Sequence, residues 1–165
     1  MQDMKRIVST PGFLQLWLKY FLGVLAGLTA IAITSPVAQE TAGLTAQSAG
    51  YAVGIFAVFN GLGRPIFGYI TDKLGFIWAA FINYALIILA SCMVFLLQPG
   101  YELLFYVSFG TLWFSMGGWL AMAPAATVGL FGATKYRKAY GYVFTAYGSA
   151  AIAGILISGL VRDLT

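Results

Sequence analysis

Histidine is absent from this chain of 165 residues, and cysteine occurs once. Without histidine, Cys92 lacks the base that most often turns a cysteine into a nucleophile. A single cysteine also has no partner for a disulfide within the chain. Charged residues make up only 8% of the sequence, whereas a typical soluble domain carries about 25%. The polar surface is therefore too small for a soluble globule of this length.

Apolar sequence is abundant instead, at 61% of residues, with a mean hydropathy of +0.87. Five continuous segments are each long enough to cross about 30 Å of hydrocarbon, and none shows the period-two alternation of barrel strands. The sequence therefore predicts an all-α integral membrane protein. The expected helices are residues 13–34, 47–70, 76–97, 103–131 and 139–161. Residues 1–12 are expected to be the end of a cytoplasmic linker, followed by a partial helical bundle over 13–165.

Basic residues gather in loops on one side of these spans. Six of the nine lie on that side: Lys5, Arg6, Lys73, Lys135, Arg137 and Lys138. The two opposite loops contain Glu40 and Glu102 and no basic residue, and Arg162 follows the last span. The positive-inside rule then predicts a cytoplasmic N-terminus in a multi-pass plasma-membrane protein. Scattered over short loops, these residues do not predict a nucleic-acid partner.

Arg64 is the main candidate for a functional residue. Eight residues separate it from Asp72 at the cytoplasmic edge, which places it about 12 Å inside the bilayer. A charge there costs on the order of 3 kcal/mol unless it has a partner, a cavity or a path to the surface. No span contains an acidic residue that could pair with it. Its planar fork suits an anionic carboxylate, although the side chain could also extend to the membrane surface.

Two further polar residues in the spans have two interpretations each. Asn60 lies one helical turn from Arg64 on the same face and could extend a polar site or bond between helices. Lys19 lies about 10 Å into the first span and could reach the surface or add a second charge to a cavity. The spans hold no metal-ligand cluster and no phosphate-binding loop, so neither an enzyme, a metal nor a cofactor is predicted.

The stretch 60–75 resembles the Major Facilitator Superfamily. Its loop motif, G-x-x-x-D-[RK]-x-G-R-[RK], is matched by Gly68, Asp72, Lys73 and Gly75, while the last two basic positions are Phe76 and Ile77. The stretches 9–28, 60–68 and 134–154 resemble the oxalate/formate antiporter family and related monocarboxylate transporters. This resemblance implies that the five spans are helices seven to eleven of twelve. The N-terminal half and the twelfth helix would then be partners outside this chain.

The same resemblance implies roles for individual residues. Arg64 would bind the carboxylate, with Asn60 beside it, and aromatic rings would line the cavity; the candidates are Trp113, Trp119, Phe144 and Tyr147. Gly68, Asp72, Lys73 and Gly75 would form a conformational latch, and Pro124 is expected to kink its span as a hinge. The family's oxalate carriers use a lysine in the eleventh helix, and this chain has none between Ala139 and Val161.

The predicted function is secondary transport of small organic anions, of the monocarboxylate, formate or oxalate class, by alternating access. The substrate is a small carboxylate and the surroundings are a lipid bilayer. The alternative is a non-transporting membrane sensor or scaffold that keeps the carrier fold. Binding of a carboxylate without flux would favour that alternative.

Overall fold

A computed structural model describes residues 7–164, with side chains through Gly159. Lys5, Arg6 and the Arg162 side chain lie outside this description. Within it the chain is helical and contains no strand, which confirms the predicted fold class. The elements are α2 (Pro11–Pro36), the π-helical η1 (Val37–Thr41), α3 (Ala46–Leu74), α4 (Phe76–Val94), α5 (Glu102–Phe131), α6 (Ala133–Val143) and α7 (Thr145–Leu164).

Five segments of the described chain are long and apolar enough to cross a membrane. They are Pro11–Thr41, Ala46–Leu74, Phe76–Val94, Glu102–Phe131 and Ala133–Gly159. The first is longer than the predicted span 13–34, because the helix continues past Pro36 through η1. The last is divided, because α6 ends at Val143 and α7 begins at Thr145.

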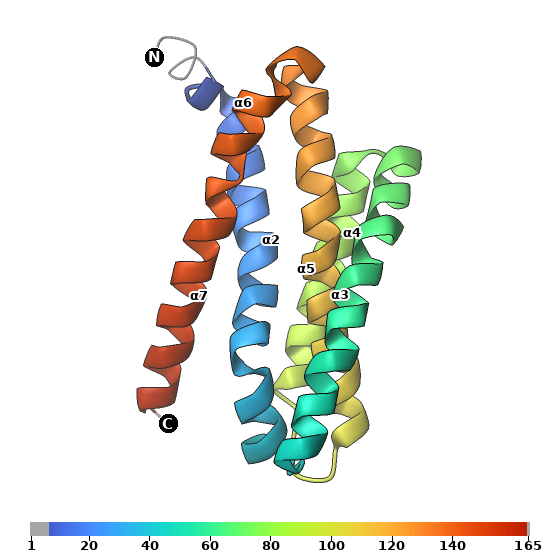
Figure 1. Cartoon of the computed structure of the whole chain (residues 1–165), viewed down its shortest axis with the longest axis vertical. Helices are drawn as coiled ribbons and strands as arrows, with labels where there is room; N and C mark the ends of the chain where they lie inside the picture. Colours follow the sequence, from blue (N-terminus) through green and yellow to red (C-terminus); the bar gives the residue numbers. More distant parts are fainter. Residues whose placement is uncertain (1–6, 165) are drawn as a thin grey trace.

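The helix α5 lies at the centre of the bundle. It packs against α3, α4 and α2, and α7 packs against the other side of α2. In Figure 1, α7, α2, α5 and α3 follow one another from left to right, with α4 behind. Half of the most apolar window of α5 is buried, compared with 17–33% in the other four spans.

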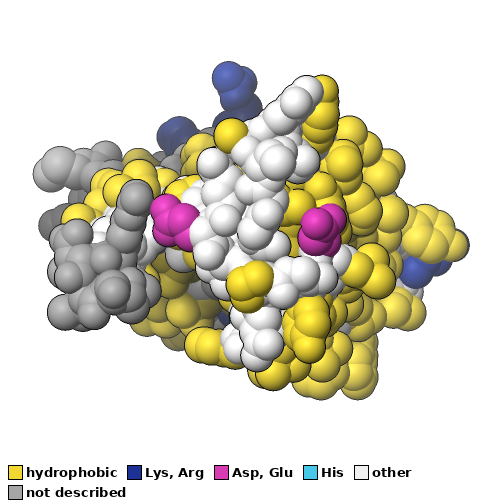
Figure 2. All heavy atoms as spheres, turned by 90° about the horizontal axis from the view of Figure 1, so that it is seen from below, with side chains coloured by type: hydrophobic (Ala, Val, Ile, Leu, Met, Phe, Trp, Pro, Cys, Tyr) yellow, Lys and Arg dark blue, Asp and Glu magenta, His cyan; other side chains and the backbone are white. Residues whose placement is uncertain are grey.

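Charge divides the two ends of the bundle. The basic end, at the top of Figure 1, carries Lys73 at the α3–α4 turn and Lys135, Arg137 and Lys138 on α6. The acidic end carries Glu40 and Glu102. Figure 2 looks onto that end and shows acidic side chains within its face, with basic ones only toward the rim. A membrane protein inserted with one orientation shows this kind of asymmetry.

Candidate functional site

The helices α3 and α5 pack at backbone distance beside Arg64. A Cβ added to Gly117 would lie 1.9 Å from the Asn60 carbonyl oxygen, and one on Gly63 would lie 2.1 Å from the Phe114 carbonyl oxygen. Neither position can therefore hold a side chain without moving a main chain. Small residues allow this close approach of membrane helices, and here they fix the helix that carries Arg64.

Asn60 bonds between the two helices. Its Nδ2 atom donates to the Trp113 carbonyl oxygen and contacts the Met116 Sδ atom, each at 3.0 Å. Of the two interpretations that the sequence left open, the bond between helices is the one present in this structure. The amide is half-buried, and its donor group points into the α3–α5 interface.

Arg64 lies on the exposed surface of α3, one turn from Asn60. It forms no ion pair or hydrogen bond with another described residue. The surface beside it is open: a Cβ on Gly61, one turn away, would meet nothing within 4 Å, and the same holds for Gly54 and Gly50.

The two tryptophans are buried rather than exposed on a cavity wall. Trp113 donates from Nε1 to the Thr34 Oγ1 atom at 3.1 Å, which ties α5 to α2. Trp119 is fully buried and lies against Gly23, where an added Cβ would be 2.0 Å from its Nε1. That Nε1 has no hydrogen-bond partner among the described residues. Contact of either ring with a substrate stays a prediction.

Phe144 and Tyr147 stack on each other where α6 gives way to α7. Their ring centroids are 5.3 Å apart with an interplanar angle of 5°. Tyr136 and Tyr140 extend the row along α6, with centroid distances of 5.4 Å between them and 5.7 Å from Tyr140 to Phe144. The spacing of three and four residues in the sequence therefore becomes a continuous aromatic row, and 42% of Phe144 is exposed.

Arg64 and Tyr147 lie on helices that this chain keeps apart. The helix α3 packs on α5, and α7 packs on α2, so α2 and α5 stand between α3 and α7 in Figure 1. The structure brings Asn60 to Trp113 and Phe144 to Tyr147, but it does not bring these pairs together. A ligand that touches both would have to bridge the α2–α5 face.

The predicted latch residues surround a sharp turn at the basic end. Gly75 has φ +82° and is at once the C-cap of α3 and the N-cap of α4; its N–H donates to the Thr71 carbonyl at 2.9 Å. This left-handed conformation favours glycine. Gly68 is half-buried, and a Cβ there would lie 4.0 Å from the Ala121 Cβ. The Lys73 ammonium lies 5.8 Å from the centroid of the Tyr69 ring, a cation–π distance.

Asp72 and Lys19 line one cavity of about 480 Å³ between the start of α2, the α3–α4 turn and the end of α5. The sequence did not predict this pairing, since the two residues are far apart in the chain and no local pattern links them. Pro124 lies within α5, which continues unbroken to Phe131. Its action as a hinge stays a prediction, and the interruption in the described bundle occurs at Phe144 instead.

These features define a class: a polytopic α-helical membrane protein with a charged residue exposed on a spanning helix. The family model of the Major Facilitator Superfamily matches residues 2–155, and the chain belongs to this family.

Similar proteins include named transporters. The chain is 28% identical over 152 residues to the oxalate:formate antiporter of Oxalobacter formigenes, covering 90% of this chain and 35% of the relative. It is 27% identical over 142 residues to YhjX, an uncharacterized MFS-type transporter of Escherichia coli (strain K12), covering 86% and 35%. It is 30% identical over 124 residues to an MFS-type transporter of Gibberella moniliformis (strain M3125 / FGSC 7600), covering 73% and 29%. The chain thus spans about a third of the length of these relatives.

Proposed function

We propose that this chain forms helices seven to eleven of a twelve-helix carrier that moves small organic anions by alternating access. The remaining helices, an N-terminal half and a twelfth helix, complete the carrier. Support comes from the family, from the third of the relatives' length that the chain spans, and from the antiporter among those relatives. The substrate class is a small carboxylate: a monocarboxylate, formate or oxalate.

The observation that carries this proposal is the exposed guanidinium of Arg64 on a spanning helix, without an ion pair to any described residue. A cation at this depth is costly unless an anion or water accompanies it. No described acidic residue lies inside a span away from its ends, so the countercharge comes from the ligand. A carboxylate fits the guanidinium with two parallel hydrogen bonds.

The aromatic row at Phe144 and Tyr147 is the second part of the proposed site. Tyr147 is half-buried, and its hydroxyl can donate to a carboxylate oxygen. No lysine occurs from Ala139 to Gly159 in the last span, so Arg64 is the fixed charge and a monocarboxylate is neutralised better than a dianion. Exchange of one anion for another also suits these helices, because they offer no intramembrane His, Asp or Glu to carry a proton.

Orientation and conformational change complete the proposal. The basic end faces the cytoplasm of a cell whose plasma membrane holds the carrier. Gly68 and Asp72 to Gly75 act there as the latch that stabilises one access state, and Pro124 is the hinge of α5. Asn60, Trp113 and Trp119 support the site from the α3–α5 and α2–α5 interfaces, where their observed contacts lie.

Uptake of labelled formate and oxalate by the complete carrier in proteoliposomes tests the proposal. Arg64→Gln and Arg64→Lys should each lower transport about a hundredfold, because a charged hydrogen-bonded partner contributes about 3 kcal/mol. Lysine keeps the charge but not the fork, so an equal loss in both variants would show that the planar fork is needed as well as the charge.

Arg137→Gln is the matched control, since it removes the same charge from the basic end and should leave uptake unchanged. Equal insertion of all variants is checked by the yield of monodisperse protein. Uptake at the parental rate by both Arg64 variants would overturn the assignment of Arg64. Carboxylate binding without any flux by the parental carrier would favour a sensor or scaffold instead.

A further inference from the structure

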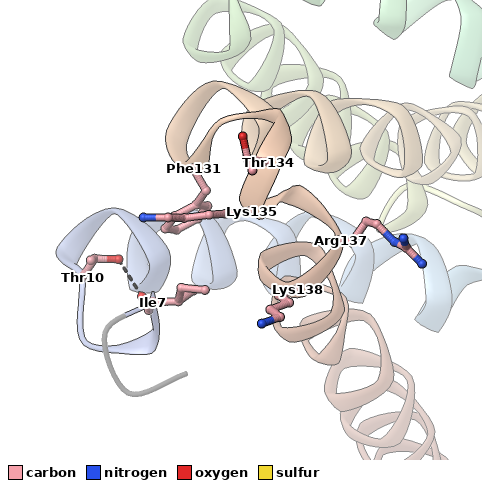
Figure 3. A pocket seen from close by; sticks show the side chains of 7 residues that line it. All are labelled: Ile7, Thr10, Phe131, Thr134, Lys135, Arg137 and Lys138. Carbon is pink, nitrogen blue, oxygen red and sulfur yellow. Dashed lines mark hydrogen bonds between the residues drawn. The ribbon is translucent and has the colours of Figure 1, made fainter. Parts of the chain in front are cut away.

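A cavity of about 760 Å³ opens at the basic end, apart from the Arg64 face. Figure 3 shows it between the start of α2 and the turn that joins α5 to α6. Its walls include Ile7 and Thr10 on one side and Phe131 with the first turns of α6 on the other. Two segments more than 100 residues apart in sequence thus enclose it.

Three cations line this cavity, and no acidic residue is among the described residues that line it. Lys135, Arg137 and Lys138 are all exposed, and none forms an ion pair with another described residue. In Figure 3 the ammonium groups of Lys135 and Lys138 point toward the side where Ile7 and Thr10 lie, while Arg137 points away. Two of the three charges therefore lie on the side of the cavity that faces Ile7 and Thr10.

The backbone adds to this positive field. Gly132 begins α6 with φ +74° and provides no side-chain cap, so the positive end of the helix dipole is not countered by a capping oxygen. Thr10 cannot serve as a further free donor, because its hydroxyl already donates to the Ile7 carbonyl at 2.7 Å. Recognition of an anion here rests on the lysines.

The apolar walls limit the kind of anion. Ile7 is 7% exposed and belongs to the buried cluster around Tyr20, and Phe131 packs against that same cluster. Charged side chains at the mouth and apolar ones behind them suit an amphiphile better than a free inorganic ion. Five membrane-length helices also place this end of the bundle at a lipid headgroup layer.

We propose that this cavity binds the phosphate headgroup of an anionic phospholipid, held by Lys135 and Lys138 with the glycerol region against Ile7 and Phe131. Basic pockets beside membrane helices bind such headgroups, with about 1 kcal/mol per lysine near the surface. The proposal does not depend on which substrate, if any, the protein transports.

Lipid binding to the full chain in a neutral detergent tests this site by native mass spectrometry. The probes are phosphatidylglycerol, phosphatidylcholine and soluble glycerol phosphate. We expect phosphatidylglycerol to bind more tightly than the other two. Lys135→Gln and Lys138→Gln should each weaken its binding about fivefold, and the double variant about twenty-five-fold.

Two further variants keep the test decisive. Lys135→Arg with Lys138→Arg retains both charges and should retain binding, which separates loss of the site from loss of the fold. Lys73→Gln removes a charge from the same end but outside this cavity and should leave binding unchanged. An equal loss in Lys73→Gln would overturn the site in favour of general surface attraction. Equal binding of phosphatidylcholine, or of soluble glycerol phosphate, would overturn the assignment to an anionic lipid.

Discussion

The α3–α5 interface and the interface of α2 with α6 and α7 differ in how closely the facing main chains approach each other. In the first, Gly63 and Gly117 meet carbonyl oxygens of the facing helix, so main chain lies on main chain. In the second, aromatic rings and one side-chain bond, from Trp17 Nε1 to Thr145 Oγ1 at 2.9 Å, join helices across an interruption at Phe144. Rings can change rotamer while carbonyl groups of a helix cannot. We infer that α3 and α5 form a fixed pair of helices, which carries Arg64. The helices α2 and α7 form an adaptable pair, which carries Tyr147.

The strongest test of the fixed pair is Gly117→Ala. The new Cβ would overlap the Asn60 carbonyl oxygen, and neither helix can yield locally. We expect a loss of about 2–3 kcal/mol in the free energy of unfolding, measured by thermal or denaturant unfolding in detergent. Gly61→Ala is the control, because its Cβ meets open space and a helical alanine should gain up to about 1 kcal/mol. Equal stability of the two variants would show that the interface is not rigid.

Tyr147→Lys tests the adaptable pair. A second cation near the aromatic row should favour a dianion, so the ratio of oxalate to formate uptake by the complete carrier should rise about tenfold. Tyr101→Lys adds the same charge to an exposed position at the acidic end and should leave the ratio unchanged. An unaltered ratio in Tyr147→Lys would remove Tyr147 from the site.

Asn60→Ala tests whether the amide serves mainly as a bond between α3 and α5. It deletes the bonds to Trp113 and Met116, and bonds of this kind between membrane helices contribute about 0.6 kcal/mol, with a maximum near 1.7. We expect a loss of about 1 kcal/mol on unfolding. Formate affinity in the complete carrier should stay within about twofold of the parental value. A large loss of affinity with unchanged stability would show that Asn60 belongs to the polar site beside Arg64.

Thr145→Val should have the smallest effect. The hydroxyl accepts from Trp17 and donates to the Tyr142 carbonyl at 2.7 Å, both near the surface. Global stability should fall by less than about 0.5 kcal/mol, while hydrogen exchange of the amides around 143–147 should become faster. Unchanged exchange there would indicate that the interruption at Phe144 is not a point of local opening.

The sequence predicts the class and the five spans, because hydropathy and length are local properties. It does not predict the interruption at Phe144, since Val143, Phe144 and Thr145 include neither proline nor glycine. The contact that accompanies the interruption comes from Trp17, more than 100 residues away. Similarly, Pro36 suggests that the first helix ends nearby, yet the backbone continues through η1 and closes with a bond from the Ala42 N–H to the Val37 carbonyl at 3.0 Å.

The sequence predicts only part of the candidate site, because it shows local properties but not contacts between distant residues. Arg64 stands out because a charge in an apolar segment is visible in the sequence itself. The partner of Asn60 and the burial of Trp119 depend on which residues face them across the bundle, here Trp113 and Gly23. Likewise, Asp72 and Lys19 share a cavity only because α2 begins at the level where α3 ends. Spacing along one helix carries no information about these neighbours.

The single glycine that joins α3 to α4 bears on how the protein is made. With only Gly75 between them, the two helices form a tight hairpin, and we expect them to enter the bilayer together. The most apolar 18-residue window of α3 has a mean hydropathy of 1.3, and that of α4 has 2.1. We therefore expect the more apolar α4 to offset the cost of inserting Arg64 during synthesis, before any ligand is present to balance its charge.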